Sequence, residues 1–121
     1  FGIPSSFKAW IDHIVRIDYT LHYKPEIKDH PLTGAFTNRN VAVVILSSRG
    51  DHDMDAGEAY AHMNHLDPAI STALGFIGLS DIRNIAVEYQ SEGGDLFEDS
   101  LRKALSATTR LAAELFKQYG S

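Results

Sequence analysis

The sequence predicts an α/β fold in which a parallel sheet carries helices on both faces. The run VAVVIL, residues 41–46, is continuously apolar and β-branched, which is typical of a strand buried on both faces. The segment DIRNIAVEY, residues 81–89, is a second strand candidate, and three stretches with helical apolar spacing surround these two. Strands that alternate with helices imply crossover connections and a parallel sheet.

The first helix is expected over residues 4–17. Pro4 suits a first helical turn, where the missing N–H of proline costs nothing. Apolar side chains then recur on one face, at Phe7, Ile11, Ile14 and Val15. Residues 18–40 show no sustained periodicity, so we expect a long connection there.

Two further helices are expected after the first strand. One runs over residues 60–76, and its Asp67-Pro68 pair could mark a fresh helix start. The other runs over residues 96–119, with Asp95 as the expected N-cap. Gly120 is the expected stop of this last helix.

Two strands cannot cover three apolar helix faces, and no strand precedes the first helix. We therefore expect residues 1–121 to be the C-terminal part of a single larger α/β domain, ordered helix, strand, helix, strand, helix. The N-terminal strands of that domain are expected to be missing from this chain.

The composition argues against several classes of partner. The 121 residues carry a formal net charge of -5 and no cluster of Lys or Arg, which argues against a nucleic-acid partner. No apolar run approaches the roughly 20 residues of a membrane span, so we expect no membrane partner and a cytoplasmic protein. Cysteine is absent, which excludes disulfides and thiolate metal sites.

The loop over residues 47–57 is the first candidate site. Ligands of open parallel sheets bind outside the carboxyl ends of the strands, and this loop follows the 41–46 strand. Its Ser47-Ser48-Arg49-Gly50 segment offers hydroxyls, a guanidinium and an accessible backbone. These groups suit a planar heterocycle with carbonyl oxygens or a phosphate. The spacing alone favours a plain solvated turn.

A histidine-based metal site is the second candidate. His52, Asp53, His62 and His65 lie close in sequence, and carboxylate–histidine sets suit zinc. The HMNH segment, however, lacks the i, i+4 histidine pair and the glutamate of a metalloprotease helix. A polar loop that leads into a solvated helix face is the favoured interpretation, and we expect no metal.

Three motifs, in the same order and at similar spacing, resemble those of a known family. FGIPSSFKAWIDHIVR, VAVVILSSRGD and LGFIGLSDI are similar to segments of the FMN-dependent NADH:azoreductase and NAD(P)H:quinone reductase family. The resemblance covers essentially all of this chain but only about the last three-fifths of a family member. It implies a flavodoxin-like doubly wound sheet, with the phosphate-binding loop upstream of residue 1.

The resemblance also implies site residues. The predicted cofactor-binding residues are Phe1, Ser48, Arg49, Gly50 and Asp51. Asp51 stands where the family usually has glycine, which leaves its own contact in doubt. A second departure is Asp18, where the family's glycine would give backbone freedom.

Two aromatic residues are implied in the substrate pocket, namely Tyr23 and Phe76, with Phe76 closing the pocket of the partner in a homodimer.

By the same resemblance, the implied function is FMN-dependent NAD(P)H oxidoreduction. NADH or NADPH gives a hydride to FMN N5, and the reduced flavin passes it to a quinone or azo compound in a ping-pong order. The flavin carries this chemistry, so no catalytic acid or base is expected from the protein. The alternative is a flavodoxin-like FMN-binding or electron-carrier module without its own acceptor pocket.

Overall fold

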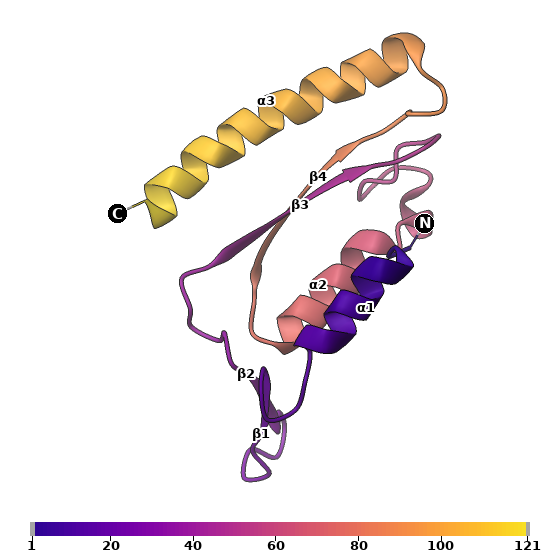
Figure 1. Ribbon diagram of the computed structural model, residues 1–121. Coiled ribbons are helices and arrows are strands. Elements are labelled where there is room, and N and C mark those ends of the chain that lie inside the picture. The colour runs from indigo at the N-terminus through magenta and orange to yellow at the C-terminus, as the bar shows by residue number, and fades with distance from the viewer. Residues whose placement is uncertain (1, 121) are drawn as a thin grey trace. The chain divides into compact units, whose positions relative to one another are not determined.

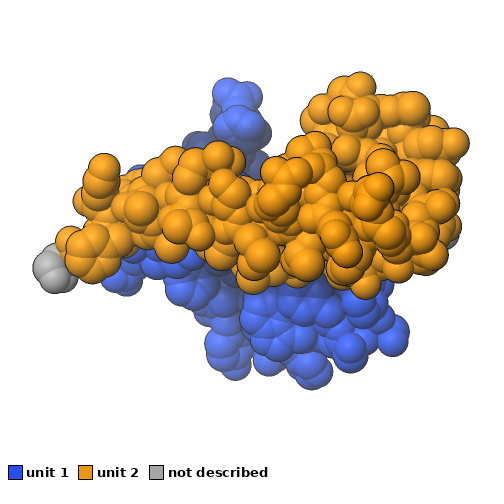
Figure 2. Space-filling view, turned by 90° about the horizontal axis from the view of Figure 1, so that it is seen from above, with its two compact units in different colours: residues 1–43, 65–82 blue, residues 44–64, 83–121 orange. Residues whose placement is uncertain are grey.

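The computed structural model describes residues 2–120, which form two compact units. Of these residues, 2–43 and 65–82 form one unit, and 44–64 and 83–120 form the other (Figure 2). The elements, in chain order, are α1 (Ser5–Ile14), β1 (Leu21–Tyr23), β2 (Leu32–Gly34), β3 (Ala42–Ser48), the 3-10 helix η1 (Ala61–Met63), α2 (Leu66–Phe76), β4 (Asp81–Val87) and α3 (Gly94–Tyr119) (Figure 1). Across residues 2–120, every helix is too short or too polar to cross a membrane.

The predicted α/β architecture is confirmed. β3 and β4 pair in a small sheet, and their arrows point the same way in Figure 1. Beyond the strand ends, the Arg49 N–H donates to the Val87 carbonyl (2.8 Å) and the Gln90 N–H donates to the Arg49 carbonyl (3.1 Å). These bonds continue the pairing into the loop that follows β3.

The core of the first unit lies between the helices and the hairpin. Ile11 of α1 is buried, as are Ile70 and Leu74 of α2 and Ile77 just after it. Leu21 of β1 is also buried. The apolar spacing that predicted the helices therefore marks their inward faces correctly. Pro4 lies at the cap position rather than inside the first turn, and its carbonyl accepts the Lys8 N–H (2.9 Å).

The prediction of an irregular connection over residues 18–40 was incomplete, because an antiparallel hairpin forms within it. Leu21 lies opposite Gly34, and Tyr23 lies opposite Leu32. Each strand has three residues, which is too short for an alternating pattern to show in the sequence. Asp18 adopts a φ of 70°, so the left-handed conformation that glycine favours is kept here by an aspartate.

The hairpin is docked on the end of α2 by close backbone contact. The Phe36 N–H donates to the Ile77 carbonyl (2.9 Å), next to Gly34 and Gly78. A methyl group on Gly34 would overlap backbone atoms of Ile77 and Gly78, and one on Gly78 would overlap the Thr37 nitrogen. Glycine is required at both positions because the two backbones touch.

The predicted 60–76 helix is divided into two. The 3-10 helix η1 ends at Met63, and α2 begins at Leu66, beside the Asp67-Pro68 pair that suggested a fresh start. Proline at the third helical residue is tolerated because the N–H groups of the first turn have no partner inside the helix.

The start of α3 differs from its prediction. The helix begins at Gly94, and Gly93 at the cap position has a φ of 68°, so Asp95 is not the N-cap. Asp95 instead lies in the first turn, where a negative charge is favourable. Gly120 follows the last helical residue as predicted.

Within α3, the hydrogen bond from Lys103 lowers the pKa of the exposed Asp99.

Candidate functional site

The loop that follows β3 presents alternating inward and outward residues. Ser48, the last residue of β3, is exposed, Arg49 is buried, and Gly50 is exposed again. Side chains of an extended chain point alternately to opposite faces, and the bonds to Val87 and Gln90 keep this segment extended. The loop therefore turns its arginine inward and its serine and glycine outward.

The Arg49 guanidinium is engaged inside the second unit. Its Nη1 lies 2.5 Å from Oε1 of Glu88 and 3.1 Å from Oδ1 of Asp55. The side chains of Arg49 and Glu88 are 7% and 5% exposed, whereas that of Asp55 is 68% exposed. The Arg49–Glu88 pair is thus a buried, charge-assisted contact, and the Asp55 contact lies at its solvent edge.

Glu88 is the residue of this site that the sequence analysis did not single out. Its Oε1 also accepts the Met54 N–H (3.3 Å), and its own N–H donates to Ser100 Oγ (2.9 Å). Its Oε2 is buried and has no hydrogen-bond partner among residues 2–120. Burial raises the pKa of Glu88, while the bonds from Met54 and Arg49 oppose that rise. A glutamate at the end of the apolar run IAVEY is the signal that could have indicated a buried partner for a cation.

The loop carries hydrogen-bond donors that the described residues leave unused. The Ser48 hydroxyl and the N–H groups of Gly50 and Asp51 have no partner within the described part of the chain. The Gly50 carbonyl accepts the Ser91 N–H (2.7 Å), and a Cβ on Gly50 would lie 3.2 Å from Ser91 Oγ. Unused donors beside an exposed carboxylate match the carbonyl acceptors and the ring N–H of a flavin. The residues present therefore fit the isoalloxazine ring of FMN.

The histidines of the alternative metal site do not belong to the acidic group that the structure brings together. Within residues 2–120, that group is Asp53, Asp55 and Glu88, whose nearest ligand atoms lie within 4.8 Å of one another. Arg49 already supplies the positive charge at its centre. His52 instead stacks on Tyr60 with ring centroids 4.2 Å apart. Sequence proximity alone had grouped His52 with the other candidate ligands.

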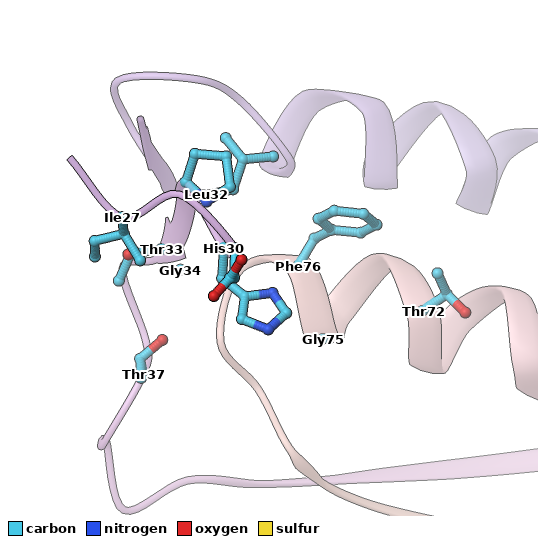
Figure 3. Close-up of a pocket in the computed structure, with 11 residues that line it drawn as sticks. Ile27, His30, Leu32, Thr33, Gly34, Thr37, Thr72, Gly75 and Phe76 are labelled. Carbon is cyan, nitrogen blue, oxygen red and sulfur yellow. The ribbon is translucent and has the colours of Figure 1, made fainter. Parts of the chain in front are cut away.

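A cleft of about 720 Å³ lies in the first unit, between the hairpin segment and the end of α2. Figure 3 shows the Phe76 ring projecting from α2 toward this cleft, with His30 beside Gly75. Phe76 is 52% exposed, so much of its ring is open to a ligand. Tyr23 is 61% exposed and is paired across the hairpin with Leu32, which lines the cleft.

The predicted site residues thus fall into two groups. Ser48, Arg49, Gly50 and Asp51 belong to the second unit, and Tyr23 and Phe76 belong to the first. Phe1 lies outside the described residues.

The geometry can be compared with known proteins. The family model described as "Flavodoxin-like fold" matches residues 1–111. The chain belongs to the flavodoxin-like fold family. Within this family, the flavodoxin-like chain is 38% identical over 115 residues to an FMN-dependent NAD(P)H:quinone oxidoreductase 1 of Pseudomonas aeruginosa. That match covers 93% of this chain and 52% of the relative.

Solved structures show the same fold. An azoreductase from Bacillus anthracis superposes on the flavodoxin-like chain with a TM-score of 0.75 at 19% identity, covering 93% of this chain and 50% of the other. An FMN-dependent NADH-azoreductase from the same organism, solved in complex with FMN, gives a TM-score of 0.70 at 15% identity. That second match covers 92% of this chain and 50% of the other. The flavodoxin-like chain spans about half the length of these proteins.

Proposed function

We propose that this chain contributes part of the FMN site of an NAD(P)H oxidoreductase that reduces quinones or azo compounds. The observation that carries the proposal is the loop after β3, where Ser48, Gly50 and Asp51 present hydrogen-bonding groups that no described residue uses. The name of the Pseudomonas aeruginosa relative, an FMN-dependent NAD(P)H:quinone oxidoreductase, supports it. Because the chain spans about half of that relative, the activity and its substrates are proposed for the intact protein that contains this chain.

Each residue of the loop has a proposed role. The Ser48 hydroxyl and the Gly50 N–H donate to acceptor atoms at the edge of the flavin ring, and the role proposed for the Asp51 carboxylate is to accept from a ring N–H. Arg49 anchors the loop to the interior of the second unit, because its guanidinium is paired with the buried Glu88. The predicted contact of Phe1 stays a prediction.

When bound, FMN supplies the chemistry, which is acceptance of a hydride from NADH or NADPH at N5 and its delivery to the second substrate in a ping-pong order. The protein's own part is to bind and orient. Phe76 and Tyr23 offer apolar ring surface for a planar acceptor such as a quinone. Homodimer formation and a cytoplasmic location stay predictions, as does the assignment of residues 1–121 to the C-terminal part of one domain.

The deciding experiment uses the purified intact protein. We expect it to bind FMN at one per chain and to oxidise NADH or NADPH only when a quinone or azo compound is present. Parallel lines in double-reciprocal plots would support the ping-pong order. A protein that binds no added FMN contradicts the proposal, and one that binds FMN but shows negligible turnover supports the electron-carrier alternative.

Ser48→Ala should weaken FMN binding without affecting the fold. The hydroxyl is exposed and has no partner within residues 2–120, so its removal costs the folded protein little. One neutral hydrogen bond is worth about 1 kcal/mol, which corresponds to roughly a fivefold higher Kd. Fluorescence titration of FMN measures this. Ser106→Ala, which changes an exposed serine on α3, is the matched control. Equal FMN affinity of the two variants would contradict a contact between Ser48 and FMN.

Phe76→Ala should raise the KM for the acceptor and leave the KM for NAD(P)H nearly unchanged. The ring is half exposed at the cleft, so the variant should lose no more than about 1 kcal/mol of stability. Loss of one aromatic contact of about 1 kcal/mol predicts a KM about fivefold higher. Leu105→Ala on α3, also exposed, controls for the loss of surface apolar area. An unchanged acceptor KM would contradict the assignment of the cleft.

A further inference from the structure

Glu88 is a buried carboxylate that lies one residue beyond β4, and the proposed function gives it no role beyond its pairing with Arg49. The residue is 4% exposed, although nothing about a flavin site requires a carboxylate inside the protein. Buried charges are rare unless they are paired, because removal from water is costly. Its position therefore calls for a reason beyond packing.

The Glu88 carboxylate joins two points of the loop that follows β3. One oxygen, Oε1, accepts from Arg49 Nη1 (2.5 Å) and from the Met54 N–H (3.3 Å). The first and last residues of the segment 49–54 therefore donate to the same buried oxygen. Met54 is itself 8% exposed, so both anchor points lie inside the second unit.

The direction of the outward groups follows from these inward contacts. Arg49 is buried on Glu88, so the side chain of its strand neighbour Ser48 faces away from the protein interior, and Gly50 is exposed. The backbone bonds to Val87 and Ser91 hold residues 49 and 50 beside the end of β4, but they do not restrain the turn after Gly50. The bond from the Met54 N–H to Glu88 restrains that turn, together with the Arg49–Asp55 contact and the bond from Asn64 Nδ2 to the Met54 carbonyl (3.5 Å).

We infer that Glu88 is a positioning residue for FMN: it holds Arg49 and Met54, and through them it fixes the direction in which Ser48, Gly50 and Asp51 meet the cofactor. This inference rests on the proposed function, since it assigns the cofactor loop to the segment 48–51. Glu88 itself touches no ligand.

Glu88→Gln in the intact protein tests this inference. Glutamine keeps the volume and an acceptor for the Met54 N–H, but it removes the charge that holds the guanidinium. The Kd for FMN should rise about tenfold, by analogy with the lower end of the effect that outer-shell partners of metal ligands have on metal affinity. The visible absorption of bound FMN should shift toward that of free FMN, which a merely structural role would not produce. Glu92→Gln, an exposed glutamate four residues further on, should leave both readouts unchanged.

Amide hydrogen exchange of the cofactor-free protein gives an independent readout. We expect faster exchange across residues 49–54 in Glu88→Gln than in the wild type, by a larger factor than across α3, whose exchange reports the general loss of stability that breaking a buried pair causes. If Glu88→Gln does not fold, Glu88→Asp carries the test, since a side chain one methylene shorter cannot reach both Arg49 and Met54.

Wild-type FMN affinity together with wild-type exchange in the folded variant would overturn the inference. A wild-type protein that binds no FMN would instead contradict the proposed function, and the exchange comparison would still decide whether Glu88 holds the loop.

Discussion

Gly34→Ala should destabilise the first unit by about 3 kcal/mol, the upper range for overpacking a well-packed site. The new methyl group would overlap the Ile77 carbonyl carbon and the Gly78 nitrogen, which are backbone atoms that cannot rotate away. Relief requires the hairpin to move off α2, which breaks the bond from the Phe36 N–H to the Ile77 carbonyl. The fluorescence of Trp10, the single tryptophan of the chain, follows unfolding of this unit in urea.

Gly78→Ala should cost at least as much, because two penalties add. Gly78 has a φ of 95°, which costs an L-residue about 1–2 kcal/mol, and its methyl group would also overlap the Thr37 nitrogen. Gly57→Ala measures the backbone penalty by itself, since Gly57 also has a positive φ, of 99°, but has open space where the methyl group would lie. Gly75→Ala, inside α2 with nothing nearby, should be stabilising by about 0.5–1 kcal/mol. Equal effects at positions 78 and 57 would show that the docking contact is loose.

These glycines also connect the fold to the proposed substrate site. Phe76 and Leu32 line the cleft from the two backbones that Gly34 and Gly78 bring together. A hairpin displaced from α2 would open that cleft, so Gly34→Ala should raise the acceptor KM as well as lower stability. The wall of the cleft is thus set by backbone contact rather than by side-chain packing.

The elements that the sequence predicts well are those whose signal is local and repeated. The apolar stripe that includes Ile11 and the β-branched run before Ser48 each span enough residues for a period to show. The β1–β2 hairpin was missed because its three-residue strands are set by docking against Ile77, a contact distant in sequence. Asp18 holds a glycine-like φ, which aspartate adopts more readily than most residues but which its presence in the sequence does not require.

The candidate site shows the same division. The segment Ser48–Gly50 was identified from its resemblance to a flavin loop, because those residues are adjacent in the sequence. The buried pairing of Arg49 with Glu88 spans 39 positions and could not be seen from spacing. It changes the proposed role of Arg49 from cofactor contact to anchor.

Arg49→Met should destabilise the second unit by about 3 kcal/mol at pH 8, the lower range for removing one partner of a buried ion pair. Glu88 would remain buried, with the Met54 N–H as the remaining hydrogen-bond donor to its carboxylate. Asp55 would lose little, because its side chain is mostly in water. Far-UV circular dichroism in urea, which reports α3, measures the loss.

The pH dependence of that loss identifies its cause. Burial already raises the pKa of Glu88 above its ordinary value near 4.5, and removing Arg49 removes an influence that lowers it. A carboxyl whose folded pKa lies above its unfolded pKa favours folding at low pH, and this contribution is lost as pH rises through the folded value. The loss of stability caused by Arg49→Met should therefore be clearly smaller at pH 5 than at pH 8.

Adding Glu88→Met should recover most of the stability at pH 8 and abolish the pH difference, because two apolar side chains of similar volume can replace a buried pair. A cost that is equal at both pH values, or a double variant no better than the single one, would show that the pair is held by packing rather than by charge.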